Sequence, residues 1–187
     1  MNGSLFQGKF VRLAMDNPGE LAKIFSHWRR DTEYWRLLDL ASVSLFSVKA
    51  FQKDFEANLE KKPFDDYLFT IHTLGDDHLI GFICLEGIDW NHGNGWVGIG
   101  LGERGYWGKG YGTDAMQLVL RYAFTELNLH RVSLDVFGYN PRAIRSYEKA
   151  GFKHEGRLRQ LLARDEQRVD DLWMGILRDE WISQQEG

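Results

Sequence analysis

Two short strings in the sequence combine residue types that can do chemistry. The first runs from Gly105 to Thr113, reads GYWGKGYGT, and alternates glycine with other residues from Gly108 to Gly112. Alternating glycines allow consecutive backbone amides to point into one concavity, and a helix that begins there adds partial positive charge. The pattern therefore predicts an anion-binding loop suited to a pyrophosphate, in preference to a flexible connection.

The same segment does not fulfil two well-known phosphate-binding motifs, the Walker loop and the dinucleotide fingerprint. A Walker loop would need glycine at Glu103 and serine or threonine at Gly110, so ATP hydrolysis is rejected. Gly100, Gly102 and Gly105 spell a dinucleotide fingerprint, but no helix is expected there and no acidic residue ends a strand about 20 residues later. The alternative hypothesis that the protein is a nicotinamide-dependent enzyme rests on this match alone.

The second string, from Asn140 to Phe152, reads NPRAIRSYEKAGF. An asparagine can cap the amides at a helix start, and proline at the first helical position loses no hydrogen bond. Gly151 is typical of a helix end. The string therefore predicts a helix from Asn140-Pro141 to Ala150 that carries Tyr147.

Hydrophobic periodicity predicts the elements that position these strings. A strand at Trp96–Leu101 precedes the glycine-rich loop, a helix over Asp114–Leu129 follows it, and Arg131–Phe137 alternates as a second strand. The two strands must pair in parallel through a right-handed crossover.

The rest of the chain adds strands and helices around this unit. Residues 32–47 are apolar without a clean period and are interpreted as core packing in preference to a pocket wall. The other elements expected are a strand at 9–15, helices beginning at Asn17-Pro18 and spanning 48–61, a hairpin of strands 66–74 and 78–88, and a closing hairpin of strands 152–163 and 169–177. The sum is an α/β (α+β) fold: one domain, residues 1–187, with a mixed sheet flanked by helices.

Composition excludes several classes of protein. Hydrophobic residues make up 43% of the 187, so the chain can bury a core and is not expected to be disordered. A formal net charge of -4 does not indicate a nucleic-acid-binding surface. Cys84 is the only cysteine, which fits a reducing compartment, and the histidines show no helical metal-site spacing. No apolar run is long enough to span a membrane. We expect a cytoplasmic protein without a metal, nucleic-acid or membrane partner.

Together, the two strings resemble the signatures of the GCN5-related N-acetyltransferase (GNAT) superfamily and, within it, the branch of Rim-type ribosomal-protein N-terminal acetyltransferases. YWGKGYGTDA at 106–115 is similar to that branch's acetyl-CoA pyrophosphate loop, and NPRAIRSYEKAGF at 140–152 to its second signature. The resemblance implies a mostly antiparallel sheet whose central parallel strands, here Trp96–Leu101 and Arg131–Phe137, splay to admit the pantetheine arm. It also implies acetyl-CoA as cosubstrate and direct transfer of acetyl to an amine in a ternary complex.

The resemblance also implies roles for individual residues. Tyr147 would be the acid that protonates the departing thiolate, since a phenol near pKa 10 can protonate a thiol near 8.5; packing on an apolar helix face is its alternative reading. Asn140 would contact the cofactor or substrate, and amides near Gly100 would stabilise the oxyanion. The predicted cofactor-binding residues are Ile99, Gly100, Leu101, Trp107, Gly108, Lys109, Gly110, Tyr111, Gly112, Thr113, Asn140 and Tyr147.

Two departures from the family pattern affect the expected chemistry. Trp107 stands where the superfamily usually has arginine or glutamine, so we expect a changed cofactor affinity with the backbone cradle retained. Trp96 stands where many relatives carry a glutamate base, which mildly favours an α-amine acceptor or deprotonation through water. The remaining candidates for the base are Glu86, Asp89, His92 and Asp135.

The sequence leaves the acceptor open among a protein N-terminus, a polyamine and another small amine. The alternative function is a module that binds acetyl-CoA and senses it without catalysis. Cys84 is expected to be a small buried hydrophobe and not an acyl carrier. A homodimer through the closing hairpin is possible by analogy of fold.

Overall fold

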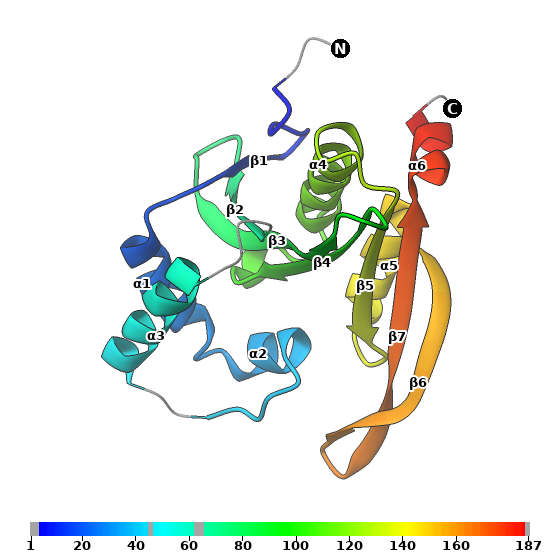
Figure 1. Cartoon of the computed structure of the whole chain (residues 1–187). Coiled ribbons are helices and arrows are strands. Elements are labelled where there is room, and N and C mark those ends of the chain that lie inside the picture. Colours follow the sequence, from blue (N-terminus) through cyan, green and yellow to red (C-terminus); the bar gives the residue numbers. More distant parts are fainter. Residues whose placement is uncertain (1–3, 45–46, 62–65, 186–187) are drawn as a thin grey trace.

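The computed structural model describes residues 4–44, 47–61 and 66–185 and contains a seven-stranded sheet in the order β1-β2-β3-β4-β5-β7-β6 (Figure 1). Among the described strands, only β4 and β5 pair in parallel, so the predicted mixed, mostly antiparallel sheet is confirmed. The strands are β1 (Val11–Ala14), β2 (Tyr67–Thr73), β3 (Leu79–Asp89), β4 (Asn94–Leu101), β5 (Arg131–Phe137), β6 (Lys153–Arg164) and β7 (Gln167–Leu177). The helices are α1 (Pro18–Trp28), α2 (Thr32–Leu38), α3 (Val48–Lys61), η1 (Arg104–Tyr106), α4 (Tyr111–Thr125), α5 (Pro141–Ala150) and α6 (Arg178–Gln185).

The two faces of the sheet have different coverings. The face against α4 and α5 carries the apolar core, including Ile83, Val97, Val132 and Leu134, all of them buried. Alternation along each strand puts the intervening residues on the opposite face. There α1 covers β3, with the rings of Phe25 and Phe82 5.0 Å apart. This second face stretches on over β5 and β7, where it carries polar residues.

The parallel strands separate after a short pairing. In the described residues, the β4–β5 register runs from Asn94 opposite Arg131 to Trp96 opposite Ser133, although β4 continues to Leu101. The predicted splayed pair is therefore present. Its open end lies beside the N-terminus of α4 and the helix α5.

A short helix between α1 and α3 differs from the sequence-based interpretation. Asp31 caps α2 by accepting from the amides of Glu33 and Tyr34 at 3.0 and 3.1 Å. Tyr34 is buried, but it lines a cavity together with Leu37 and Leu38, so core packing was the wrong reading for the two leucines. Leu45 and Phe46, at the end of the same stretch, lie outside the described residues.

Tertiary contacts fix α2 to the far end of the molecule. Arg36 forms an ion pair with Asp165 in the β6–β7 turn at 2.5 Å, and the Tyr139 hydroxyl donates to the Arg36 carbonyl. Arg164 donates to two carbonyls just after α2, both at 3.0 Å. α2 therefore bridges the front of β4 to the closing hairpin.

Helix boundaries follow local chemistry. α4 begins at Tyr111, three residues before the predicted start, because Gly110 adopts φ +94° as its N-cap. α5 has the predicted ends: Asn140 accepts from the Ala143 amide at 3.2 Å and Gly151 closes it at φ +103°. The C-terminal helix α6 was not predicted from the sequence.

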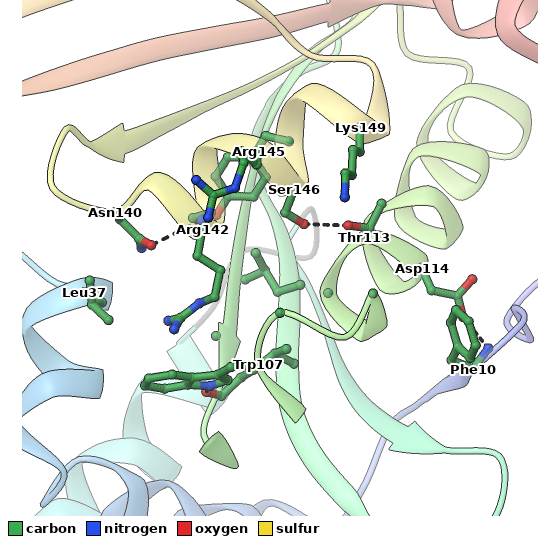
Figure 2. A pocket seen from close by; sticks show the side chains of 18 of the residues that line it. Phe10, Leu37, Trp107, Thr113, Asp114, Asn140, Arg142, Arg145, Ser146 and Lys149 are labelled. Atoms are coloured by element: carbon green, nitrogen blue, oxygen red, sulfur yellow. Dashed lines mark hydrogen bonds between the residues drawn. The ribbon is translucent and has the colours of Figure 1, made fainter. Parts of the chain in front are cut away.

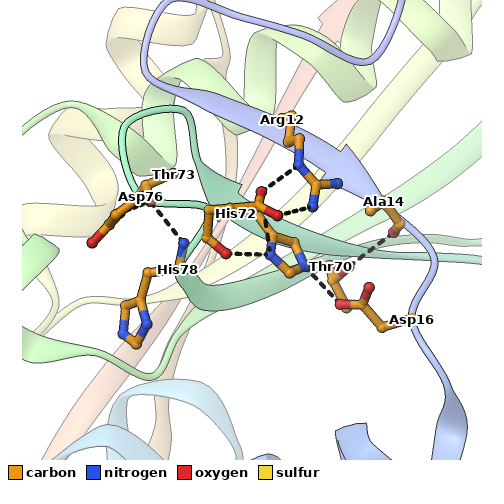
Figure 3. A network of polar contacts seen from close by, with 9 residues as sticks. Arg12, Ala14, Asp16, Thr70, His72, Thr73, Asp76 and His78 are labelled. Atoms are coloured by element: carbon orange, nitrogen blue, oxygen red, sulfur yellow. Dashed lines mark hydrogen bonds and ion pairs between the residues drawn. The ribbon is translucent and has the colours of Figure 1, made fainter.

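A polar network holds the outer strand pair β1–β2 (Figure 3). Arg12 binds Asp77 with two hydrogen bonds of 2.6 and 2.9 Å, and His72 contacts Asp16 at 2.6 Å. Asp77 belongs to the predicted hairpin turn and has φ +56°. Among the described residues, no helix is long and apolar enough to cross a membrane.

Candidate active site

A cavity of about 420 Å³ lies at the open end of the splayed strands, between the loop before α4 and the helix α5 (Figure 2). Ten of the twelve predicted cofactor-binding residues line it; Lys109, which is exposed, and Tyr111 do not. The ten are Ile99, Gly100, Leu101, Trp107, Gly108, Gly110, Gly112, Thr113, Asn140 and Tyr147. Tyr111 packs instead against Phe10 and Tyr106, with ring centroids 5.7 and 5.0 Å apart.

The glycine-rich loop has left-handed backbone at two of its glycines. Gly108 and Gly110 adopt φ +70° and +94°, which residues with a Cβ rarely adopt. No side chain caps the first turn of α4, so its N-terminal amides are left for a ligand. The side of the cavity formed by this loop is therefore backbone at the positive end of a helix, an arrangement that binds phosphate groups.

The edge of β4 supplies further amides. Gly102 donates to Ile80 on β3 at 3.0 Å, and hydrogen-bonding direction alternates along an antiparallel pair. The amides of Ile99 and Leu101 therefore point away from β3, toward the gap where β5 has diverged. This is where a thioester carbonyl would need hydrogen-bond donors.

Trp107 is held by a hydrogen bond and by cation–π contacts, of which the one to Arg142 is shorter than the one to Arg104 at 5.3 Å. Its indole nitrogen donates to the Leu101 carbonyl at 2.7 Å, and the Arg142 guanidinium lies 3.9 Å from the centre of its ring (Figure 2). Arg142 reaches this ring from α5. A cation is thus present beside the loop even though Trp107 itself is uncharged, because the indole holds Arg142 by a cation–π contact.

Sequence reasoning missed the basic residues at the cavity. Arg142, Arg145 and Lys149 line it from one face of α5, and Lys9 lines it from the N-terminal segment. Their spacing of three and four residues in the second string was the available signal. Lys9 is brought there by Asp114, whose carboxylate accepts from the amides of residues 9–11 at 2.7 to 3.1 Å.

Tyr147 lines the cavity from α5. Burial raises the pKa of Tyr147, and the negative charge of Asp135 raises it further, so the phenol keeps its proton at neutral pH. A protonated hydroxyl is the form a general acid requires. Thr113 and Ser146, whose hydroxyls lie 2.7 Å apart, join α4 to α5 beside it.

The four candidate bases lie in different surroundings. Asp89 accepts from the amides of Asn91 and His92, so it stabilises a turn, and His92 is exposed. Glu86 is exposed on β3. Only Asp135 is close enough to Tyr147 to influence its pKa.

The fold and this cavity correspond to a known family. The model of the acetyltransferase (GNAT) domain matches residues 12–153, and the chain belongs to that family. The predicted superfamily is confirmed, and with it the enzyme class of the domain, an acetyl-CoA-dependent acyltransferase.

Two of the sequence relatives are Bacillus subtilis proteins described as N-acetyltransferases. The probable N-acetyltransferase YjcK is 36% identical over 121 residues, which are 64% of this chain and 62% of YjcK. The prophage-derived uncharacterized N-acetyltransferase YokL is 34% identical over 127 residues, which are 67% of this chain and 68% of YokL. The match thus spans slightly less than two thirds of YjcK.

Solved structures of the same fold cover nearly the whole chain. Spermidine N-acetyltransferase from Vibrio cholerae, in complex with CoA and spermine, superposes with a TM-score of 0.79 at 22% identity over 92% of this chain and 98% of that one. A GNAT-family acetyltransferase from Bacillus anthracis gives 0.75 at 20% identity over 93% and 98%. At these identities the likeness supports the fold.

Proposed function

We propose that this protein is an N-acetyltransferase that transfers acetyl from acetyl-CoA to a primary amine. The observation that carries the proposal is the cavity at the splay of β4 and β5, which joins the glycine loop, four basic side chains and Tyr147. Amides at a helix N-terminus and the cations Lys9, Arg142, Arg145 and Lys149 suit the phosphates of the cofactor.

The chemistry follows from the order of groups along the cavity. Phosphates bound at Gly108 and Gly110 direct the pantetheine arm into the gap between the strands. The amides of Ile99 and Leu101 then stabilise the oxyanion, and Tyr147 protonates the departing thiolate. Transfer is direct: Cys84 is buried on β3, as expected for a small hydrophobe, and is not used as an acyl carrier.

A small cationic amine is the acceptor we favour. The Vibrio cholerae neighbour, described as a spermidine N-acetyltransferase, was crystallised with spermine, which supports a small-amine acceptor for the shared fold. The α-amine of a protein N-terminus, implied by the resemblance to the Rim-type branch, is the other acceptor to test. A cytoplasmic location and a homodimer stay predictions.

Calorimetric titration with acetyl-CoA, with NAD and ATP in parallel, tests the cofactor half of the proposal. We expect binding of acetyl-CoA alone. Release of CoA thiol in the presence of a panel of amines and of a peptide with a free N-terminus tests the transfer. Binding without transfer to any of them would favour the sensing module, and no binding by folded protein would overturn both functions.

A further inference from the structure

The face of the sheet opposite the core carries two carboxylates close to the reaction centre. The β5–β7 register puts Asp135 opposite Trp173 and Phe137 opposite Asp171, so all four side chains share this face. Trp96 on β4 shares it too, through its pairing with Ser133. Of the side chains on this face, we call the two carboxylates and the two indoles together the acidic face: Trp96, Asp135, Asp171 and Trp173.

Asp171 is a buried carboxylate with an unused oxygen. Its residue is 4% exposed, and its Oδ2 accepts from the Trp173 indole at 3.1 Å, whereas Oδ1 is buried and no donor in the described chain reaches it. Burial raises the pKa of Asp171, and the charge of Asp135 raises it further. Oδ1 in this state lacks a hydrogen-bond donor, and an ammonium that reaches it by displacing the partly exposed Trp173 side chain would supply one.

Asp135 lies between Asp171 and the catalytic gap. One side of it is open to solvent, and partial burial on the other raises the pKa of its carboxyl. Its charge acts on Asp171 on one side and on Tyr147 on the other. Arg131, a cation on the same face, is already paired with Glu155. The negative charge near the gap is therefore available to a ligand.

Two indoles border these carboxylates. The rings of Trp96 and Trp173 meet edge to face with centroids 5.1 Å apart, and Trp173 is 42% exposed. Carboxylates beside tryptophan faces are the combination that attracts an alkyl ammonium, by ion pairing and by cation–π contact.

We propose that the acidic face binds the acceptor, a short aliphatic diamine whose reacting ammonium is held by Asp135 and whose second ammonium is held by Asp171. Diagonal neighbours across an antiparallel pair lie about 7 Å apart, a separation that a short alkyl chain spans. This inference rests on the acetyltransferase function proposed above and assigns its acceptor site. It also assigns Asp135 as the base of the reaction, in place of the glutamate that many relatives carry where this chain has Trp96.

The proton and electron balance of the step is complete with these groups. The reacting ammonium loses one proton to the Asp135 carboxylate, and the neutral amine forms the C–N bond to the thioester carbonyl carbon. The C–S bond breaks with its electron pair on sulfur, and Tyr147 protonates that thiolate. The second proton leaves the nitrogen and restores Tyr147, while Asp135 releases its proton to water.

The test compares putrescine with butylamine, which has the same carbon chain and one ammonium, in the full-length protein. In the wild type we expect kcat/KM for putrescine to exceed that for butylamine about tenfold, the factor that roughly 1.4 kcal/mol represents. Asp171→Asn should abolish this preference by raising the KM for putrescine. Asp135→Asn should lower kcat/KM for both amines by about two orders of magnitude, as expected for loss of a base.

Controls separate this site from the cofactor site and from folding. Both variants should bind acetyl-CoA like the wild type by calorimetry, and Asp179→Asn, the same charge change on exposed α6, should leave all constants unchanged. Asp135 is exposed, so Asp135→Asn tests the proposal even where Asp171→Asn melts early. Amine constants within twofold of wild type in folded Asp135→Asn would overturn the inference alone. Acetyl-CoA binding with no amine or peptide acetylated by the wild type would overturn the proposed function as well.

Discussion

The two sides of the cavity are built in different ways. On the cofactor side, two unbroken strings supply most of the binding groups, and much of the contact is backbone: Gly108, Gly110 and the amides that open α4. On the acceptor side, single residues from β4, β5 and β7 meet only because strand register brings them to one face.

This difference separates what the fold keeps from what it can vary. A backbone cradle tolerates Trp107 at a position where a charged or amide side chain is usual, because Arg142 restores a cation from another helix. The acceptor side has no such cradle, so changing one of its side chains changes which amine fits. The following predictions test whether the two sides are separable.

Tyr147→Phe gives the largest effect, because Tyr147 lies where the two sides meet. Removing the phenol hydroxyl should lower kcat by roughly 100- to 1,000-fold, the range for loss of a general acid, with acetyl-CoA affinity unchanged. Steady-state kinetics and calorimetry measure the two quantities. Unchanged turnover would assign the proton to another group and leave Tyr147 as a packing residue.

Trp107→Ala tests the cofactor side through its cation. Loss of the indole removes the platform 3.9 Å from Arg142, and we expect the Kd of acetyl-CoA to rise about tenfold, the upper part of the cation–π range. Arg142→Ala should weaken binding to a similar extent. The double variant should add little to either, because the two residues act as one unit, and fully additive effects would contradict that unit.

The cofactor side could be predicted from the sequence because the residues that shape it act on their own neighbours in the chain. Asn140 caps its own helix through its side-chain oxygen, and Gly151 and the loop glycines act through their own backbone, so a single string specifies their geometry. The basic face of α5 was within the same string and needed only helical spacing to be found. The residue that broke the pattern, Trp107, was recognised, but Arg142 as its partner depends on how α5 packs beside the loop.

The acceptor side was beyond sequence reasoning for physical reasons. Asp135 was one of four candidate bases, and only the β5–β7 register shows that it shares a face of the sheet with Asp171, its diagonal neighbour. α2 showed no clean period because its side chains serve the core and the cavity at once: Tyr34 is buried near Gly100, and it lines the cavity together with Leu37 and Leu38. α6 was not predicted, because a contact that holds it is tertiary and cannot be read from local sequence. Glu180 in its first turn forms an ion pair with Lys153 at 2.6 Å.

Gly108→Ala measures how far the cradle depends on backbone conformation. At φ +70° a Cβ costs about 1 kcal/mol, so the loop should shift and the Kd of acetyl-CoA should rise roughly fivefold. Gly105→Ala is the matched control, because an added Cβ there meets nothing within 4 Å and the residue lacks a positive φ. Equal effects of the two variants would show that the left-handed conformation is not what the cradle requires.

Tyr139→Phe is the mildest probe and tests, through α2, whether the acceptor side can be disturbed without the cofactor side. The substitution removes the donor that the Tyr139 hydroxyl offers to the Arg36 carbonyl, one of the contacts that hold α2 to the closing hairpin. The net value of such a bond is about 1 kcal/mol, and we expect part of it to appear as a twofold rise in the KM for the amine. The Kd of acetyl-CoA, measured on the same preparation, should not change. If cofactor affinity fell as far as the KM rose, α2 would position acetyl-CoA too, and the two sides would share a wall that couples them.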